Sequence, residues 1–365
     1  MYIAEYIETK DGVEDRGKMK KRIFLHKILL GISIVLVIGV LVIVGWYYIS
    51  LKDFYTENSG SYGKKEFEIP GLEDQNFVEQ GLCYDKEKDY FYLTGYMSDK
   101  RPDPIHIVEG ESGKWLKSVY LLHQDGSPMI SHAGGLATAG KYIYLAGSGD
   151  CCLYVYSKQE ILDAPDGEGV KSVGTFSTAK NKEDGVKVSW VAGSEKMIYV
   201  GEFYLEGSEA YRLRENHKIE TATGNNSAIM IGFQIDENAE FGLAPIPVEA
   251  YSLPDKVQGV AFGEEAIYLS QSYAIVPSHI SKNRKFEMGQ FTIMNATVPL
   301  YSLMEIASYT VIPMSEEIDI RNGKLYIATE AAMKFPLKIG TVFDAEWIHS
   351  MDVIKKDSES TELCR

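Results

Sequence analysis

The sequence predicts an all-β domain that is held outside the cytoplasm by a single membrane-spanning helix. Three observations lead to this fold class. One uncharged apolar stretch lies near the N-terminus, the chain holds 24 tyrosines, 14 phenylalanines and 33 glycines, and a two-strand pattern recurs five times after residue 65. Aromatic residues suit the pleated surface of strands, and glycine supplies the positive φ of tight turns. At 365 residues, 45% of them hydrophobic, the chain can bury a sizeable core.

The apolar stretch covers residues 28–49 and reads ILLGISIVLVIGVLVIVGWYYI, without one charged side chain. A helix of this length, rising about 1.5 Å per residue, matches a hydrocarbon core about 30 Å thick. Trp46, Tyr47 and Tyr48 gather at its far end, where aromatic rings settle among lipid headgroups, and basic residues precede it. The positive-inside rule therefore predicts a cytoplasmic N-terminus. The basic residues are Lys18, Lys20, Lys21, Arg22 and Lys27.

We therefore predict a signal anchor over residues 23–49, preceded by a cytoplasmic tail (1–22) and followed by a polar juxtamembrane linker (50–64). A cleavable signal peptide is the alternative, but its apolar region would be shorter, and GWYYISLKDF offers no small-x-small cleavage site. The β domain is predicted over 65–356, with a C-terminal tail over 357–365. The membrane is accordingly the first expected partner.

The net charge of −15 is unevenly distributed along the chain. The first 49 residues hold seven basic and five acidic side chains, so the acidic surplus belongs to the β domain. An acidic surface repels phosphate backbones, which argues against nucleic acid as a partner. Cations and cationic substrates are tolerated, although solubility alone explains the same charge.

Five segments share a strand, a turn and a second strand whose central tyrosine is followed by an aliphatic residue. The tyrosine recurs at intervals of 52, 55, 69 and 58 residues, and a small residue stands two positions after each copy. Small residues permit neighbouring sheets to pack closely. Another strand precedes each copy and further strands lie between copies, which gives about four strands per repeating unit. The five tyrosines are Tyr92, Tyr144, Tyr199, Tyr268 and Tyr326.

The segment VEGESGKWLKSVYL, residues 108–121, is similar to a turn of bacterial β-propellers in which an acidic residue and Ser/Thr-Gly-Lys precede a strand. With the repeat over residues 65–355, it makes the chain resemble the β-propeller superfamily. That resemblance implies four-stranded blades arranged radially around a central channel. Five blades are expected, or six if residues 286–308 hold an irregular extra sheet. The strand KEFEIPG near residue 65 is expected to complete the last blade.

In a propeller, the loops that lead into the first strands and those that follow the second strands open on one face, around the channel. The resemblance therefore places polar and aromatic side chains at this mouth, and loops on a rigid scaffold commonly carry binding residues. His132 could bind a ligand there or simply order its own loop, and Gln80 and Gln258 could merely tie blades together. The ligand-binding candidates are Gln80, His132, Trp190, Gln258, Gln271, Glu316 and Glu330.

Carboxylates near the mouth raise two possibilities for chemistry. Glu202, Glu316 and Glu317 could gather at the axis, where crowded carboxylates bind a hard cation such as Ca²⁺ or raise one another's pKa. Such a site resembles the axial calcium site of six-bladed lactonases, which implies a cation-dependent hydrolase. Five-bladed glycoside hydrolases use paired carboxylates, and the corresponding catalytic candidates are Glu202 and Glu317. Asp319 is a further acid on the last repeat, equally expected as a satisfied core residue.

Cys151 and Cys152 are adjacent in a loop that also belongs to the predicted mouth. A vicinal disulfide floors a cofactor pocket in some propellers, which would suggest redox chemistry. Two unlinked cysteines are the alternative, because the eight-membered ring requires a distorted peptide. The sequence shows no zinc-ligand spacing, no G-x-S-x-G elbow and no phosphate-binding P-loop.

The sequence leaves three functions open, because one propeller fold hosts many functions. The favoured one is a membrane-anchored, extracytoplasmic propeller that binds a small molecule, a carbohydrate or a protein segment at its mouth. The second is a hydrolase that acts through the axial carboxylates, so whether the chain is an enzyme is not decided. The third is a scaffold in a cell-envelope assembly that uses its rim as the contact surface.

Overall fold

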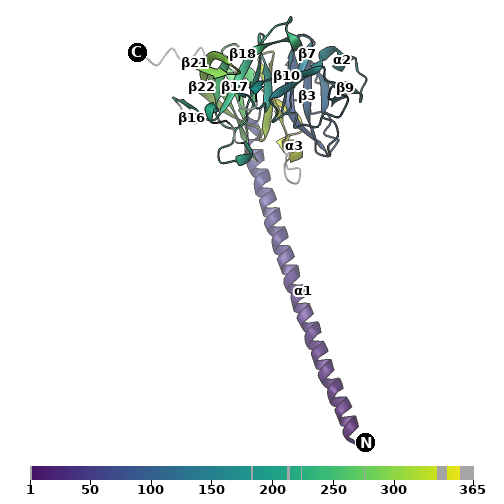
Figure 1. The fold of residues 1–365 in the computed structure, drawn as a ribbon. Coiled ribbons are helices and arrows are strands. Elements are labelled where there is room, and N and C mark those ends of the chain that lie inside the picture. The colour runs from purple at the N-terminus through teal and green to yellow at the C-terminus, as the bar shows by residue number, and fades with distance from the viewer. Residues whose placement is uncertain are drawn as a thin grey trace. The chain divides into compact units, whose positions relative to one another are not determined.

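The computed structural model describes residues 2–181, 184–211, 214–222, 224–274, 276–334 and 343–353 (Figure 1). The chain divides into two compact units, residues 1–57 and residues 58–365, and each is described by itself. The first unit is helical. The second consists mainly of antiparallel β-sheets.

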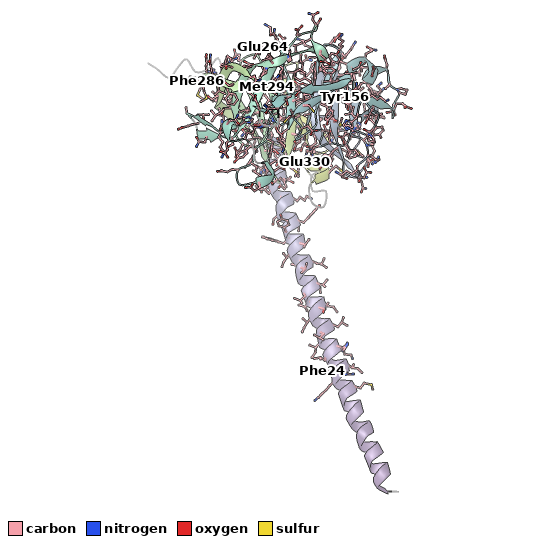
Figure 2. The ribbon with its side chains drawn as sticks, in the orientation of Figure 1. Phe24, Tyr156, Glu264, Phe286, Met294 and Glu330 are labelled. Carbon is pink, nitrogen blue, oxygen red and sulfur yellow. The ribbon has the colours of Figure 1, made fainter. Side chains whose placement is uncertain are left out.

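The helix α1 spans Tyr2–Asn58 and is long and apolar enough to cross a membrane. The side chains of residues 28–44 are exposed, and Figure 2 shows Phe24 projecting from the helix. Phe24 is 66% exposed. The helix continues into the predicted linker because neither glycine nor proline interrupts residues 46–59. A short 3₁₀ turn, η1 (Ser59–Ser61), follows it.

The first sheet of the second unit joins four sequential strands in the order β2-β3-β4-β5, with the short strand β9 added in parallel at the outer edge. The second sheet has the order β6-β7-β8-β10. Between β8 and β9 lies the short helix α2 (Lys158–Asp163), which Ser157 caps by accepting a hydrogen bond from the Glu160 N–H. The strands are β2 (Phe77–Asp85), β3 (Tyr90–Met97), β4 (Pro104–Glu109), β5 (Trp115–Leu122), β6 (Gly135–Ala139), β7 (Tyr142–Ala146), β8 (Cys152–Ser157), β9 (Gly169–Lys171) and β10 (Gly174–Ser177).

Two further groups of four strands, β13-β14-β17-β18 and β19-β20-β21-β22, are joined into one eight-stranded sheet. The junction is a parallel pairing of β18 with β22 that places Ala250 opposite Leu300. The hairpin β21–β22 is unusually long and occupies the stretch 286–308 in which an extra sheet was an alternative. The strands are β13 (Trp190–Gly193), β14 (Met197–Gly201), β17 (Ala228–Ile235), β18 (Leu243–Leu253), β19 (Val257–Phe262), β20 (Ile267–Gln271), β21 (Ser278–Ile293) and β22 (Ala296–Val311).

The last sheet has the order β23-β24-β25-β1, so the N-terminal strand of this unit pairs with its C-terminal strand, as the sequence predicts. In this sheet β1 (Lys64–Glu68) lies antiparallel to β25 (Trp347–Asp352), next to β24 (Lys324–Thr329) and β23 (Ser315–Arg321). Minor elements complete the unit: β11 (Ala179–Asn181), β12 (Asp184–Gly185), β15 (Ile219–Thr221), β16 (Gly224–Asn226), η2 (Glu209–Tyr211), η3 (Glu215–His217), η4 (Glu240–Gly242) and α3 (Ala331–Lys334).

The first strands of these groups are neighbours in a closed cycle, β2 to β6 to β13 to β19 to β23 and back to β2. Antiparallel sheets arranged in such a ring form a β-propeller. The repeated tyrosines lie on the second strands and are at most 5% exposed. Four of them, Tyr92, Tyr144, Tyr199 and Tyr326, belong to apolar clusters of buried side chains. Gly201 must be small for a reason within its own sheet, because it stands opposite Trp190 in the β13–β14 pair and a side chain there would collide with the Trp190 ring.

Candidate functional site

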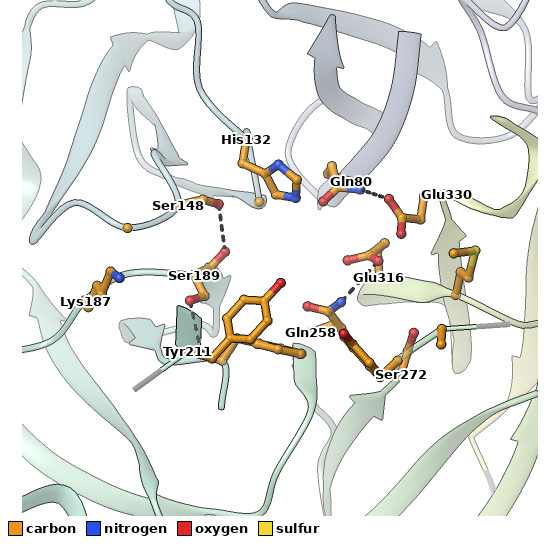
Figure 3. Close-up of a pocket in the computed structure, with 16 residues that line it drawn as sticks. Gln80, His132, Ser148, Lys187, Ser189, Tyr211, Gln258, Ser272, Glu316 and Glu330 are labelled. Atoms are coloured by element: carbon orange, nitrogen blue, oxygen red, sulfur yellow. Dashed lines mark hydrogen bonds between the residues drawn. The ribbon is translucent and has the colours of Figure 1, made fainter. Parts of the chain in front are cut away.

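A cavity of about 630 Å³ opens where the first strands of all these groups converge (Figure 3). Its lining comes from the loops before the first strands, from the starts of those strands, and from the loops after the second strands. This is the location that the propeller resemblance predicts for the mouth. Five of the seven ligand-binding candidates line it: Gln80, His132, Gln258, Glu316 and Glu330.

The loops that build the cavity hold an unusual backbone. Ser148, Ala274 and Met314 line the cavity with positive φ angles of 42°, 60° and 55°, and Ala133 beside it has a φ of 46°. Non-glycine residues rarely adopt this left-handed conformation, and such strain tends to concentrate at functional sites. Gly134 is required for a different reason, since a Cβ there would collide with the carbonyl oxygen of Ser189.

Two glutamine–glutamate pairs form one side of the cavity. The Gln80 amide donates from Nε2 to the backbone oxygen of Glu79 (2.8 Å) and to Oε2 of Glu330 (2.9 Å). The Gln258 amide donates from Nε2 to Oε1 of Glu316 (3.3 Å). Gln80 and Glu316 are each only 3% exposed, so this side of the cavity is deep. The two pairs connect the last group of strands to the groups on either side of it. This is the connecting role that was one of the two possibilities for Gln80 and Gln258.

Lys187 and two serines lie across the cavity from these pairs (Figure 3). The Ser148 hydroxyl donates to the Ser189 backbone oxygen (3.4 Å), while Ser189 Oγ accepts the backbone N–H of Phe203 (3.1 Å). Within the described part of the chain, Lys187 makes no ion pair. A lysine thus lies on the side of the cavity opposite Glu316 and Glu330.

An aromatic wall, formed by Phe203, Tyr211 and Tyr273, adjoins the two sides. The Phe203 ring contacts Tyr211 edge to face, with centroids 4.8 Å apart, and Tyr273 at 6.4 Å. Tyr211 and Tyr273 remain 39% and 44% exposed, so both rings can meet a ligand. Amphipathic rings of this kind offer apolar faces together with hydroxyl groups that form hydrogen bonds.

His132 is exposed at the rim of the cavity and stacks on Tyr96, with ring centroids 4.7 Å apart and planes 19° from parallel. The loop that carries His132 is held in place by the buried Asp103, which accepts hydrogen bonds from the Ser131 backbone N–H (2.8 Å) and hydroxyl (2.7 Å). Burial raises the pKa of Asp103 to about 6, against the lowering effect of the Ser131 donors. The His132 side chain thus lines the cavity while it stacks on Tyr96, and the Asp103 hydrogen bonds hold the neighbouring Ser131.

Two predicted ligand-binding residues lie outside the cavity lining. Trp190 is 1% exposed and packs beneath Gly201, because it points between sheets rather than into the channel. Gln271 donates from its Nε2 to the Asp255 backbone oxygen (3.1 Å) and accepts a hydrogen bond from Ser281 (3.1 Å). Both side chains organise the walls between strands.

The two catalytic candidates are also buried away from the cavity lining. Glu202 is fully buried, 2.9 Å from Nδ1 of His217, and accepts the backbone N–H of Ile229 (3.2 Å). Glu317 accepts the backbone N–H groups of Leu82 (2.7 Å) and Leu136 (2.8 Å) through Oε2. Each carboxylate is therefore engaged by its own surroundings, and the cavity carboxylates are Glu316 and Glu330 instead.

Glu317 lies among other buried acids, and this neighbourhood does not fit a calcium site. Burial raises the pKa of Glu317 well above its usual range, and the nearby Asp319 and Glu79 carboxylates raise it further. Both oxygens of Glu79 are buried without a hydrogen bond among the described residues, and burial likewise raises its pKa. Within the described ranges, no three acidic, histidine or cysteine side chains are placed to hold a metal ion. We expected three carboxylates to converge at the axis: Glu202, Glu316 and Glu317. Among the described residues they do not converge, because each of them contacts different partners.

Cys151 and Cys152 are both free thiols in the structure and form no disulfide with each other. The Arg214 guanidinium lies 3.8 Å from Cys151 Sγ. Burial raises the pKa of the Cys152 thiol to about 11, which keeps that sulfur protonated and poorly nucleophilic at neutral pH. Neither cysteine lines the cavity.

Sequence reasoning missed Lys187, Tyr211 and Tyr273 as cavity residues. Lys187 precedes a first strand by three residues, and Tyr273 follows a second strand by two. These are the positions from which other mouth residues were chosen, so the signal was present. Tyr211 lies ten residues beyond β14 in an irregular loop whose path no short pattern predicts.

No protein-family model matches the chain, and no curated protein sequence matches it. Several solved structures are similar. Glutaminyl cyclase from Myxococcus xanthus is 10% identical, with 73% of this chain and 90% of that chain covered and a TM-score of 0.38. The PQQ-bound aldose sugar dehydrogenase from Streptomyces coelicolor is 13% identical, with 73% and 76% covered and a TM-score of 0.37. BamB from Moraxella catarrhalis is 10% identical, with 69% and 83% covered and a TM-score of 0.31. At these scores, no function is transferred from them.

Proposed function

We propose that this chain is a membrane-anchored, extracytoplasmic propeller that binds a small molecule, a carbohydrate or a protein segment at the mouth of its channel. One observation carries the proposal: a single cavity collects polar side chains from every first strand or its adjoining loop. A concave site with a few convergent polar groups and an aromatic wall is the usual form of a ligand pocket. The strained backbone around it is consistent with that role.

The proposed propeller has five blades. The closed cycle of five first strands supports this count. The parallel pairing of β18 with β22 joins two blades at their outer edges and accounts for the eight-stranded sheet without a sixth blade. The long β21–β22 hairpin supports the same count, because it uses the residues that a sixth sheet would need.

The proposed anchor is α1, with the N-terminus in the cytoplasm. The apolar length of this helix and the five basic residues before its apolar segment support the orientation. Protease treatment of intact cells should digest a C-terminally tagged propeller and spare a tag at the N-terminus. Digestion of the N-terminal tag instead would reverse the orientation, and release of the propeller without its helix would show that the segment is a cleaved signal.

Ligand binding is tested by the unfolding temperature of the full chain in detergent micelles against a panel of sugars, amino acids and short peptides. A ligand that binds only the folded state raises that temperature, and the stabilisation grows with the logarithm of one plus the ratio of ligand concentration to Kd. The expected result is a shift for one class, lost in Gln258→Ala, which removes a cavity side chain. If no compound shifts the unfolding temperature, the cavity is not a small-ligand site. Crosslinked partners that map to the rim would then favour the scaffold function.

The hydrolase alternative has less support from the geometry. Its catalytic candidates Glu202 and Glu317 are buried at separate positions and neither lines the cavity. A paired mechanism requires two carboxyl groups to flank one scissile bond. The cavity carboxylates Glu316 and Glu330 each accept a hydrogen bond from a glutamine amide. Such fixed carboxylates at the cavity wall suit the binding of a ligand better than catalysis by a carboxylate pair.

A further inference from the structure

A second groove, of about 460 Å³, lies outside the mouth cavity and shares no lining residue with it. One wall is the strand β1 with the residues that follow it, and the other is the turn between β4 and β5 with Trp115. The first and last sheets of the ring meet here, since a Cβ at Gly113 would collide with the Phe67 side chain. The groove volume lies within the usual range of binding pockets, about 300–1,000 Å³.

The strand β1 is an open edge of the last sheet, because its only described strand partner is β25. Ile69 donates its backbone N–H to the Glu346 carbonyl, on the side of β25 (2.8 Å). The backbone groups of successive residues in a strand point to alternate sides, so the N–H and C=O of Glu68 point to the open edge. Such an edge can accept an added strand, and the main-chain hydrogen bonds then supply affinity.

The charged side chains of the groove indicate what an added strand should carry. Glu68 and Glu73 are exposed, and within the described residues neither of them makes an ion pair. Glu66 differs from them, because it forms an ion pair with Lys324 (3.0 Å). No described residue that lines the groove is basic. Charge complementarity therefore favours a cationic partner segment.

Trp115 adds an aromatic surface that suits a cation. Its side chain is 47% exposed, and the ring is held in place because Nε1 donates to Ser118 Oγ (3.2 Å). A tryptophan ring attracts a guanidinium or ammonium group to its face. Trp347, which also lines the groove, shows this attraction within the chain, since Lys65 Nζ lies 5.0 Å from its ring centroid. An Arg side chain of a bound segment would therefore find both a ring and carboxylates in one groove.

We propose that this groove binds an extended, basic segment of a partner protein. The segment pairs as an added strand along β1 and places Arg or Lys side chains near Trp115, Glu68 and Glu73. The site is independent of the ligand proposed for the mouth, so either proposal can fail without the other. A glycan would also suit a tryptophan ring, but it would not use the backbone groups of the open edge.

The test uses end-blocked peptides that carry fluorescein: Arg-Val-Arg-Val-Arg, its forms N-methylated at the valines or at the arginines, and Glu-Val-Glu-Val-Glu. Binding to the full chain in uncharged detergent micelles is measured by fluorescence polarisation at low salt. The Arg peptide should bind at least about tenfold more tightly than the Glu peptide, because the groove carboxylates repel the latter. Only one of the two N-methylated forms should lose affinity, by about tenfold, because alternate N–H groups face β1 and the others face solvent.

Substitutions locate the bound peptide. Trp115→Ala should weaken the Arg peptide about tenfold, and Glu68→Gln about threefold, because the first removes a ring and the second a single exposed charge. Both side chains are exposed, so both variants are expected to fold. Phe286→Ala and Glu264→Gln, at exposed positions in the β19–β22 group (Figure 2), are the matched controls and should leave the affinity unchanged.

The inference is overturned if the Arg peptide does not bind, if the Arg and Glu peptides bind equally, or if the two N-methylated forms bind alike. Unchanged affinity in both Trp115→Ala and Glu68→Gln would place the peptide elsewhere and overturn it as well. Oligosaccharide binding that depends on Trp115, without binding of the Arg peptide, would make the groove a glycan site. Self-association of the full chain in sedimentation, lost in Glu68→Lys, would make the occupant a second copy instead.

Discussion

Glu316 and Glu317 are consecutive residues of β23, nearly equal in exposure, yet they have different surroundings. Glu316 is 3% exposed, lines the cavity and accepts a side-chain hydrogen bond from Gln258. Glu317 is 1% exposed and accepts two backbone N–H groups from other sheets. Successive side chains of a strand point to opposite faces, and the irregular register between Ser315 and Ile318 opens the ladder here. Burial alone therefore does not distinguish a carboxylate that lines the cavity from one that accepts backbone N–H groups between sheets, whereas the hydrogen-bond partners do.

The role of Glu317 is to satisfy the inner edges of two first strands. These edges face the channel and carry N–H groups that no neighbouring strand can pair, and Oε2 of Glu317 accepts one from β2 and one from β6. Asp319 does the same for the Tyr84 N–H (2.7 Å). The last sheet thus closes the ring through side chains as well as through strand contacts.

The largest effect that we expect is from Glu317→Ala. The substitution leaves two buried N–H groups without an acceptor, and each orphaned group costs about 1–3 kcal/mol. We expect the free energy of unfolding to fall by roughly 3–5 kcal/mol, measured by urea titration of tryptophan fluorescence on the full chain. Glu317→Gln should lose much less, because its amide oxygen still accepts.

Glu316→Ala is the matched control for this comparison. It should lower the free energy of unfolding by less than Glu317→Ala does, while weakening ligand binding. Glu316 accepts a hydrogen bond from a side-chain amide at 3.3 Å, whereas Glu317 accepts two backbone N–H groups. Equal losses of stability in Glu316→Ala and Glu317→Ala would contradict the division of roles.

The second prediction concerns pH and uses Asp319. Burial raises the pKa of Asp319 to about 6, against an unfolded value near 4. The folded state then holds more protons between these values, so this residue stabilises the fold most below about pH 4 and less as pH rises through 6. We expect its contribution to fall by roughly 2–3 kcal/mol between pH 4 and 7.5.

The measurement is the difference in unfolding free energy between the native chain and Asp319→Asn across that pH range. Asn retains one acceptor oxygen and loses one of the two backbone contacts, which gives an offset that does not vary with pH. Glu317 titrates in both proteins, so to first order its contribution cancels from the difference. A difference that stays constant from pH 4 to 7.5 would show that the pKa of Asp319 is not raised.

The sequence predicts the repeat well because each repeated tyrosine belongs to a short strand–turn–strand pattern that can be recognised from neighbouring residues alone. Tyr92 and Tyr144 are fully buried on second strands, and β1 pairs with β25 as the strand order requires. Mouth residues such as His132 follow from their position before a first strand. The prediction fails where the direction of a side chain depends on packing between sheets, as for Trp190. It also fails for Glu202, whose partner His217 is brought back by an irregular loop that carries no periodic signal.

The smallest effect that we expect is from metal removal. The predicted calcium site required Glu202, Glu316 and Glu317 to converge. In the structure, Glu202 contacts His217, Glu316 accepts from the Gln258 amide, and Glu317 accepts backbone N–H groups. EDTA should therefore shift the unfolding temperature of the full chain by less than about 1 °C, and millimolar Ca²⁺ should not raise it. A stabilisation by Ca²⁺ that survives Glu317→Gln but disappears in Glu316→Gln would place a cation at the cavity instead. In that case the two neighbouring carboxylates would still differ in role. Glu316 would be a metal ligand, whereas Glu317 would accept backbone N–H groups at the edges of two first strands.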